Sequence, residues 1–212
     1  MPRAEGWPAE RLRTARAVVG CWGLGAALVA SLALCVVGSL AGDVYVELPF
    51  LRNKTVVLHL IPVLSAMALG FGLVDRTPGL TLLAPVPLRL PLLRLAGTVV
   101  VALPVLGTLV GAGWTLAGAS VVLGMLGLAA LSAALLRLWY WVPFFGLVVG
   151  WAQARPPAAA ATAGPGWLLL SLGVLAAGGA AYVLVETWRV RRVIHGDDAR
   201  TRGGRDLDTM RP

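Results

Sequence analysis

The chain has few charged residues and a single lysine, Lys54. Of its 212 residues, 13% are charged and 58% are hydrophobic, whereas a soluble domain carries about 25% charged residues. No polar stretch between the apolar ones is long enough for a separate soluble domain of about 50 residues. The shortage of charge therefore excludes an ordinary globular protein and favours one that lives in a bilayer.

The sequence also lacks the motifs of several enzyme classes. It contains no Walker A loop, no HExxH zinc motif and no GxSxG nucleophile elbow. Its two cysteines, Cys21 and Cys35, fall several helical turns apart in one apolar stretch, so they cannot form a disulfide with each other. The chain is therefore not expected to hydrolyse a nucleotide itself, and whether it is an enzyme of another kind stays open.

Long apolar stretches fill most of the chain. A run of about 20 apolar residues crosses a bilayer as a helix, and six stretches approach that length: 18–40, 55–74, 95–114, 116–136, 141–154 and 167–185. We therefore predict an all-α polytopic membrane protein with six transmembrane helices over 18–188. An interfacial N-terminal segment, 1–17, precedes this domain, and a basic, disordered tail, 189–212, follows it.

The segment between the second and third stretches, Asp75 to Gly97, is apolar but broken by prolines. A straight helix does not tolerate prolines at this density. We expect residues 75–94 to form an interfacial elbow, with leucines towards the lipid and arginines towards the headgroups. The prolines are Pro78, Pro85, Pro87 and Pro91, and the arginines are Arg76, Arg89 and Arg94.

The arginines are distributed unevenly along the chain. Those of the N-terminal segment, the elbow, Arg137 and the tail fall on one predicted side, while Arg52, Lys54 and Arg155 fall on the other. By the positive-inside rule, both termini and the elbow are cytoplasmic in a multi-pass protein of the cell membrane. The net charge of +8 is thus explained by orientation and lipid contact, and no nucleic acid partner is expected.

Ionisable residues within or beside the stretches would mark a proton path or a catalytic centre. The sequence offers four: His59, Asp43, Glu47 and Glu186. We expect His59 to be a packing residue, Glu186 to pair with Arg189 one turn on, and Lys54 or Arg52 to neutralise Asp43 and Glu47. Whether any of the four has a functional role stays open.

Small residues four apart let membrane helices approach closely. Three glycine pairs have this spacing: Gly38/Gly42, Gly107/Gly111 and Gly146/Gly150. Packing within the bundle is the simpler explanation, and a contact between subunits is the alternative. For a subunit contact we favour Gly38/Gly42, because the stretch with Gly107/Gly111 is expected to form a tight hairpin with its successor.

The order of these features resembles the membrane subunits of ABC-2 type ABC transporters, in the small six-helix form of high-GC Gram-positive bacteria. The features are a basic N-terminal segment, the elbow LAPVPLRLPLLRLAG, the stretch RLWYWVPFFGLVVG with its WxP-like start, a Pro/Ala-rich outer loop, and a last helix ending in WRVRR.

The resemblance implies a permease that works with a separate ATP-binding cassette subunit, so that ATP binds to the partner and the chain itself holds no cofactor or metal. It also implies a second permease subunit, identical or related, and an amphipathic or lipid-like substrate that is exported. Candidate residues for coupling to the ATPase are Arg76, Arg89, Arg94, Arg11 and Arg13, and candidates for the dimer interface are Gly38, Gly42, Gly107 and Gly111. Two other functions stay open: a polytopic enzyme or accessory factor acting on lipids or isoprenoids, and a non-catalytic scaffold or immunity protein.

Overall fold

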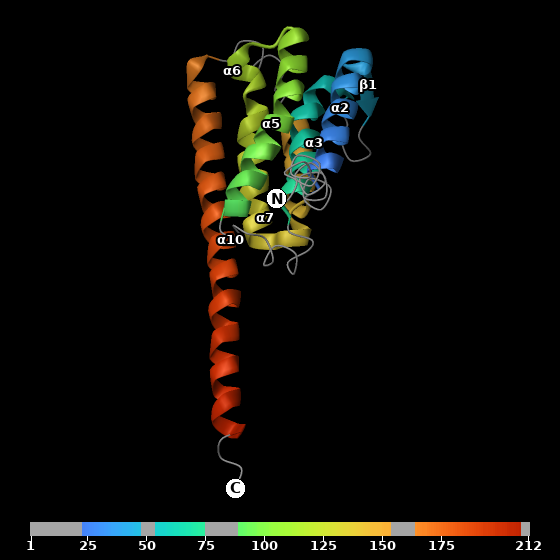
Figure 1. Cartoon of the computed structure of the whole chain (residues 1–212). Coiled ribbons are helices and arrows are strands. Elements are labelled where there is room, and N and C mark those ends of the chain that lie inside the picture. Colours follow the sequence, from blue (N-terminus) through green and yellow to red (C-terminus); the bar gives the residue numbers. More distant parts are fainter. Residues whose placement is uncertain (1–22, 48–53, 75–88, 154–163, 209–212) are drawn as a thin grey trace, which may run out of the picture.

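The computed structural model describes residues 23–47, 54–74, 89–153 and 164–208. These residues are mostly helical, as the sequence predicts (Figure 1). The elements are α2 (Leu24–Ala41), β1 (Tyr45–Glu47), β2 (Lys54–Val56), α3 (Val57–Gly70), η2 (Phe71–Leu73), α5 (Leu90–Gly111), α6 (Leu116–Ala119), α7 (Val121–Leu136), η4 (Arg137–Trp139), α8 (Val142–Gln153) and α10 (Pro165–Asp208).

Four helical stretches of the described chain are long and apolar enough to cross a membrane. They are Leu24–Ala41, Leu90–Gly111, Leu116–Trp139 and Pro165–Val193. The helix Val57–Leu73 is apolar but shorter, and α8 has only 12 residues. The chain is thus a helical, membrane-embedded protein whose described residues include four helices of spanning length, and the count of six membrane-spanning helices stays a prediction.

The helices lie side by side in a bundle with α7 at its centre. In the apolar 18-residue stretch around α7, 72% of the residues are buried inside the protein. The corresponding share is 17% for α2, 28% for α5 and 22% for α10. The residues of α7, VVLGMLGLAALSAALL, include no charge on any face, and a helix that is apolar all round belongs in an interior. α3 packs against α7, α2, α5 and α8, so it shares this interior.

The most extensive interface between two helices of the bundle is that of α7 and α10. These two helices cross at glycines. A Cβ atom added at Gly178 of α10 would overlap the carbonyl oxygen of Gly127 of α7. Three residues earlier on α7, a Cβ atom at Gly124 would lie 3.3 Å from the Cα of Ser171. Both backbones therefore touch directly, which only small residues allow.

The turn between α5 and α6 forms the hairpin that the sequence predicts. Gly113 has φ +90°, a left-handed conformation that glycine adopts without steric cost. The hydroxyl of Thr115 then caps α6 by accepting a hydrogen bond of 3.0 Å from the N–H of Gly118. The chain thus reverses over four residues, Ala112 to Thr115.

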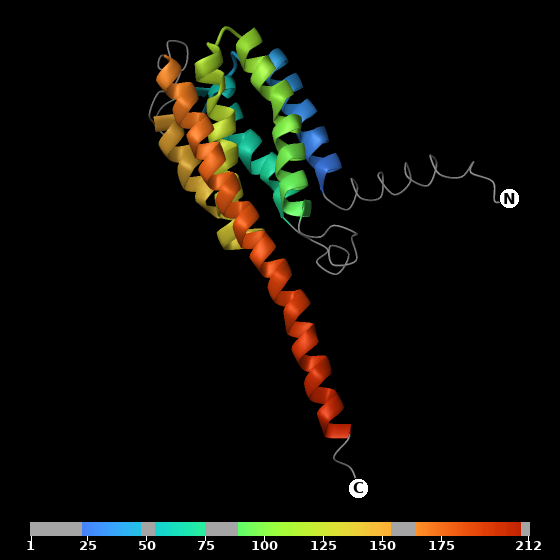
Figure 2. The ribbon, with the colours of Figure 1, turned by 60° about the vertical axis from the view of Figure 1, so that its left-hand side comes forward.

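The structure corrects two predicted boundaries. Helix α5 begins at Leu90, not at residue 95, because Pro91 occupies its first turn, where a missing N–H is tolerated. Of the predicted elbow, residues 75–88 lie outside the described residues. Helix α10 continues to Asp208 rather than giving way to a disordered tail at 189 (Figure 2). Extending an existing helix needs no new nucleus, and the sequence after Gly166 contains no proline before Pro212.

After α2 the chain forms two short antiparallel strands. In β1 and β2, Tyr45 pairs with Val56 and Glu47 with Lys54. The N–H of Leu58 donates to the carbonyl of Gly42, which continues the pairing to the start of α3. The pairing of the two strands thus places Glu47 beside Lys54.

The α7–α10 crossing predicts a strong difference between two glycines of α10. Gly178→Ala should destabilise the bundle by about 1–3 kcal/mol, because its methyl group has no room beside Gly127. Gly173→Ala is the matched control: a Cβ atom there meets nothing within 4 Å, so the change should be neutral or slightly stabilising. Thermal unfolding in detergent measures both. Equal midpoints for the two variants would contradict the crossing.

Candidate functional site

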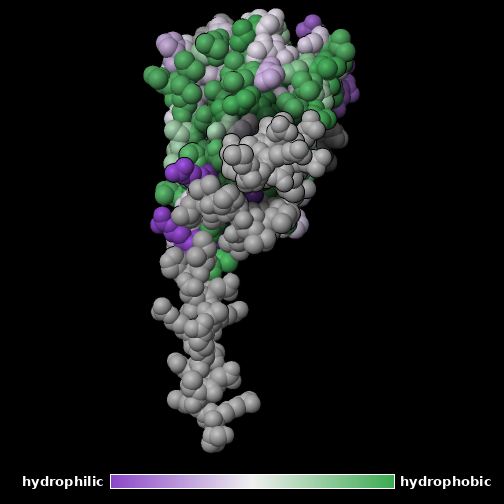
Figure 3. Space-filling model, in the orientation of Figure 1, coloured by the Kyte–Doolittle hydropathy of each residue, from purple (hydrophilic) through white to green (hydrophobic). Residues whose placement is uncertain are grey.

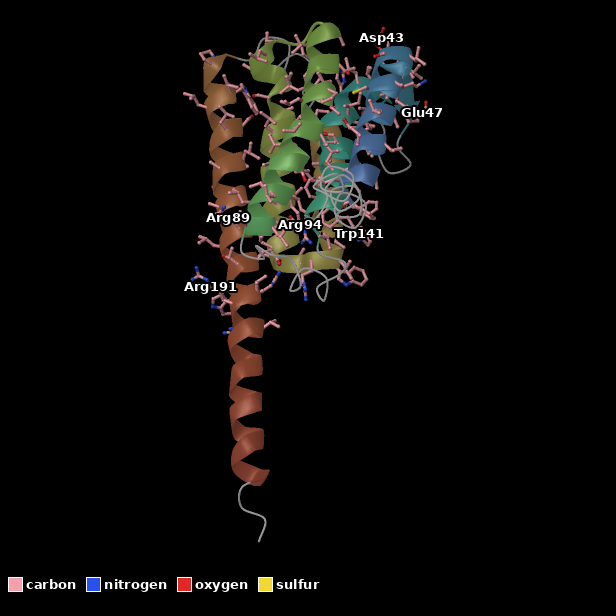
Figure 4. The ribbon with its side chains drawn as sticks, viewed as in Figure 1. Asp43, Glu47, Arg89, Arg94, Trp141 and Arg191 are labelled. Carbon is pink, nitrogen blue, oxygen red and sulfur yellow. The ribbon has the colours of Figure 1, made fainter. Side chains whose placement is uncertain are left out.

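The described charges gather at the two ends of the bundle. Figure 4 places Arg89, Arg94 and Arg191 at one end and Asp43 and Glu47 at the other. Hydrophobic residues make up most of the coloured surface between them (Figure 3). We call the first the arginine end. Together with Arg137, Arg189 and Arg192 it carries six of the described arginines, and Glu186 is the one acid among the described residues from 89 to 193.

The coupling candidates differ in exposure. Arg89, at the N-cap of α5, is exposed. Arg94, one turn further along, is only 3% exposed, so its guanidinium faces the protein rather than a partner. Arg76, Arg11 and Arg13 lie outside the described residues. Of the described candidates, Arg89 is thus the one that a soluble partner could reach.

Arg189 joins α10 to the end of α7. Its guanidinium forms an ion pair with Glu186 one turn earlier, as the sequence predicts. A second nitrogen, Nη2, donates a hydrogen bond of 2.7 Å to the carbonyl oxygen of Ala134, in the last turn of α7. Carbonyls of a last turn lack helical partners, and a cation there is favoured by the helix dipole. The hydrogen bond from Arg189 to Ala134 thus fixes the position of α10 along the axis of α7.

Two tyrosine hydroxyls hold the end of α3. Tyr140 donates to the carbonyl of Met67, and Tyr182 donates over 2.7 Å to the carbonyl of Leu73. Tyr182 was not among the predicted site residues, although a tyrosine inside an apolar stretch signals a buried hydrogen bond. Tyr140 is 5% exposed, so it packs inside the bundle beside these helix ends.

Around Tyr140 the chain makes a strained corner with exposed aromatic rings. Arg137 has φ 53° and ψ −115°, a conformation that costs a non-glycine residue about 1–3 kcal/mol. The ring of Trp141 lies 5.8 Å from that of Trp139 and 5.4 Å from that of Phe145. Exposed tryptophans beside arginines are typical of a membrane–water boundary.

The glycine pairs face different surroundings. A Cβ atom at Gly38 would lie 2.7 Å from Ile61 Cδ1 of the same chain. At Gly107 and Gly111 it would meet nothing within 4 Å. The small-residue face of α5 is therefore open, as is that of α8, where a Cβ atom at Gly146 or Gly150 would also meet nothing within 4 Å. At Gly38 the space is occupied by Ile61 of α3. A dimer through either pair stays a prediction.

At the opposite end, Lys54 Nζ lies 3.0 Å from Glu47 Oε1, and both side chains are exposed. The ring of His59 lies 6.1 Å from that of Trp114. Over the described part of the chain, no three His, Cys, Asp or Glu side chains lie close enough together to hold a metal ion.

Buried hydroxyls in the interior bond to backbone carbonyls. Ser31 donates to Val101 over 2.7 Å, Ser65 to Pro62 over 2.8 Å and Thr98 to Arg94 over 2.7 Å. The hydroxyls of Ser31, Ser65 and Thr98 thus find their hydrogen-bond acceptors within the chain itself.

Comparison with family models, with curated proteins and with solved structures gave no match.

The tyrosine at the end of α3 gives a test of this packing. Tyr182→Phe should lower the free energy of unfolding by about 1–2 kcal/mol, because the carbonyl of Leu73 loses its donor in a buried site. Tyr45, 67% exposed, provides the control: Tyr45→Phe should change little. Chemical unfolding in mixed micelles compares them. If both variants behaved like wild type, the hydroxyl of Tyr182 would not hold α3.

Proposed function

We propose that this chain is the membrane-spanning permease subunit of an ABC-type exporter, which works with a separate ATPase subunit and moves an amphipathic or lipid-like substrate. The observation that carries the proposal is the arginine end: exposed Arg89 and its neighbours cap a bundle whose sides are apolar. Such an end offers a soluble partner a charged surface directly attached to the helices that it would have to move.

All six helices cross the membrane in this proposal. Helix α7 ends at the arginine end, and α10 starts at the opposite end, beside α6 (Figure 1). The chain between them, including α8, has to travel the length of the bundle, which supports a fifth crossing. The 12 residues of α8 rise only about 18 Å, so the bilayer would thin locally to match it.

The orientation follows from charge. Cytoplasmic loops of membrane proteins are enriched in arginine and lysine, and the described arginines gather at one end. We therefore propose that the arginine end faces the cytoplasm of the cell membrane, where an ATPase subunit and its ATP would be found.

The substrate path is proposed to lie between two permease subunits. The bundle interior is packed and its hydroxyls bond to its own backbone, which speaks against a polar route through one copy. The open face at Gly107 and Gly111 would allow a second subunit to approach α5 closely. A path bordered by apolar and small residues suits an amphipath better than an ion or a sugar.

The test is whether an ATPase depends on the arginine end. The tagged chain, purified from its own membranes, should bring ATPase activity with it. Arg89→Glu should lower that activity roughly ten-fold, since reversing a contact charge weakens docking. Arg94 is a poorer choice, because at 3% exposure a reversal there would disturb folding.

Lys54→Glu is the matched control, because Lys54 is exposed at the opposite end; it should leave the ATPase activity unchanged. The proposal fails if the wild-type chain brings no ATPase with it, or if the two reversals lower the activity equally. It also fails if the chain, freed of every partner, exports a substrate with ATP.

A further inference from the structure

We propose that α10 carries a binding site for the phosphate group of an anionic phospholipid, formed by Trp188 and Arg192 where α10 leaves the bundle. This lipid site would be present whether or not the chain transports a substrate, because it concerns only the lipid that the chain binds at the arginine end.

The height of the site follows from the contacts of Arg189. Because Arg189 Nη2 bonds to the carbonyl of Ala134 over 2.7 Å, the neighbouring residues of α10 lie level with the end of α7. The apolar part of α10 also ends here, since Glu186 is its first charged residue. Trp188 and Arg192 are thus at the level where hydrocarbon gives way to headgroups.

The geometry prepares an arginine for phosphate. Arg192 Cζ lies 3.6 Å from the centroid of the Trp188 ring, one helical turn earlier. This cation–π contact holds the guanidinium against the ring, and a guanidinium carries its N–H donors in pairs along its edges. A planar guanidinium binds two phosphate oxygens at once through such an edge.

The charge around the site selects an anionic lipid over a zwitterionic one. Glu186, the single acid among the described residues from 89 to 193, is already bonded to Arg189 and mostly buried. Arg191 and Arg192 follow directly and are exposed. A lipid with net negative charge gains from this field, whereas the amine of a zwitterionic lipid is repelled by it.

Exposed apolar surface beside the arginines favours a lipid over a soluble acidic partner. Trp188 is 51% exposed and Val193 is 48% exposed. A tryptophan with an apolar body and a polar N–H is suited to the bilayer boundary. A lipid meets both parts of this surface, with its phosphate at Arg192 and its glycerol and upper chains at Trp188.

The experiment measures which lipids the full chain retains. The protein is reconstituted in vesicles of equal parts phosphatidylglycerol and phosphatidylcholine, extracted with mild detergent, and its bound lipids are counted by native mass spectrometry. Wild type should retain phosphatidylglycerol in excess. Arg192→Gln should reduce that excess about five-fold, the effect of one arginine at a charged surface. Trp188→Leu, which removes the stack, should also reduce it.

Two matched variants separate the site from general charge. Lys54→Gln removes a positive charge at the opposite end and should retain the wild-type excess. Arg192→Lys keeps the charge but not the planar fork, and should lose at least half of the excess. The site is ruled out if wild type retains both lipids in their bulk ratio, if Arg192→Gln equals Lys54→Gln, or if Arg192→Lys equals wild type. Should Arg192→Gln fail to fold, Trp188→Leu decides between the same outcomes.

Discussion

The direct backbone contact between α7 and α10 is the constraint on which the other features of the bundle depend. With glycine at positions 127 and 178, the two helices meet without intervening side chains. This contact brings Tyr182 to the carbonyl of Leu73 and Arg189 to the carbonyl of Ala134. In a bilayer, where the hydrophobic effect does not hold helices together, close packing and hydrogen bonds of this kind must do so. The arrangement of the arginine end therefore rests on a contact deep inside the membrane.

The two ends of the bundle differ in the charges of their described residues. At one end lie the tight turn between α5 and α6 and the exposed ion pair between Glu47 and Lys54. At the other, a strained corner at Arg137, exposed tryptophans and arginines gather where α10 leaves the bundle. Satisfied hydroxyls and packed apolar side chains lie between them. The proposed partner ATPase and the proposed anionic lipid would each recognise the arginine end, through different residues.

Apolar length made the helices predictable from the sequence, because crossing a bilayer demands a run of residues that little else explains. The pairing of Glu186 with Arg189 was also predictable, because one helical turn separates them. The contacts between helices were not predictable in this way, because Gly127 and Gly178 lie on different apolar stretches. Glycine spacing within a single stretch pointed to Gly38 and Gly107 instead. The start of α5 was misplaced because Pro91 was taken to break a helix whose first turn it occupies. The path of α10 past 189 was missed because composition alone suggested disorder.

In the proposed topology the helices alternate in direction, so that the short α8 crosses the membrane. Single cysteines at Val44, Leu138, Gly164 and Val193, in a chain with Cys21 and Cys35 replaced by alanine, test it through labelling of intact cells with an impermeant maleimide. The account predicts that positions 44 and 164 react from outside, and that positions 138 and 193 react only after the membrane is opened. Labelling of positions 138 and 164 from the same side would show that α8 does not cross and would contradict the account.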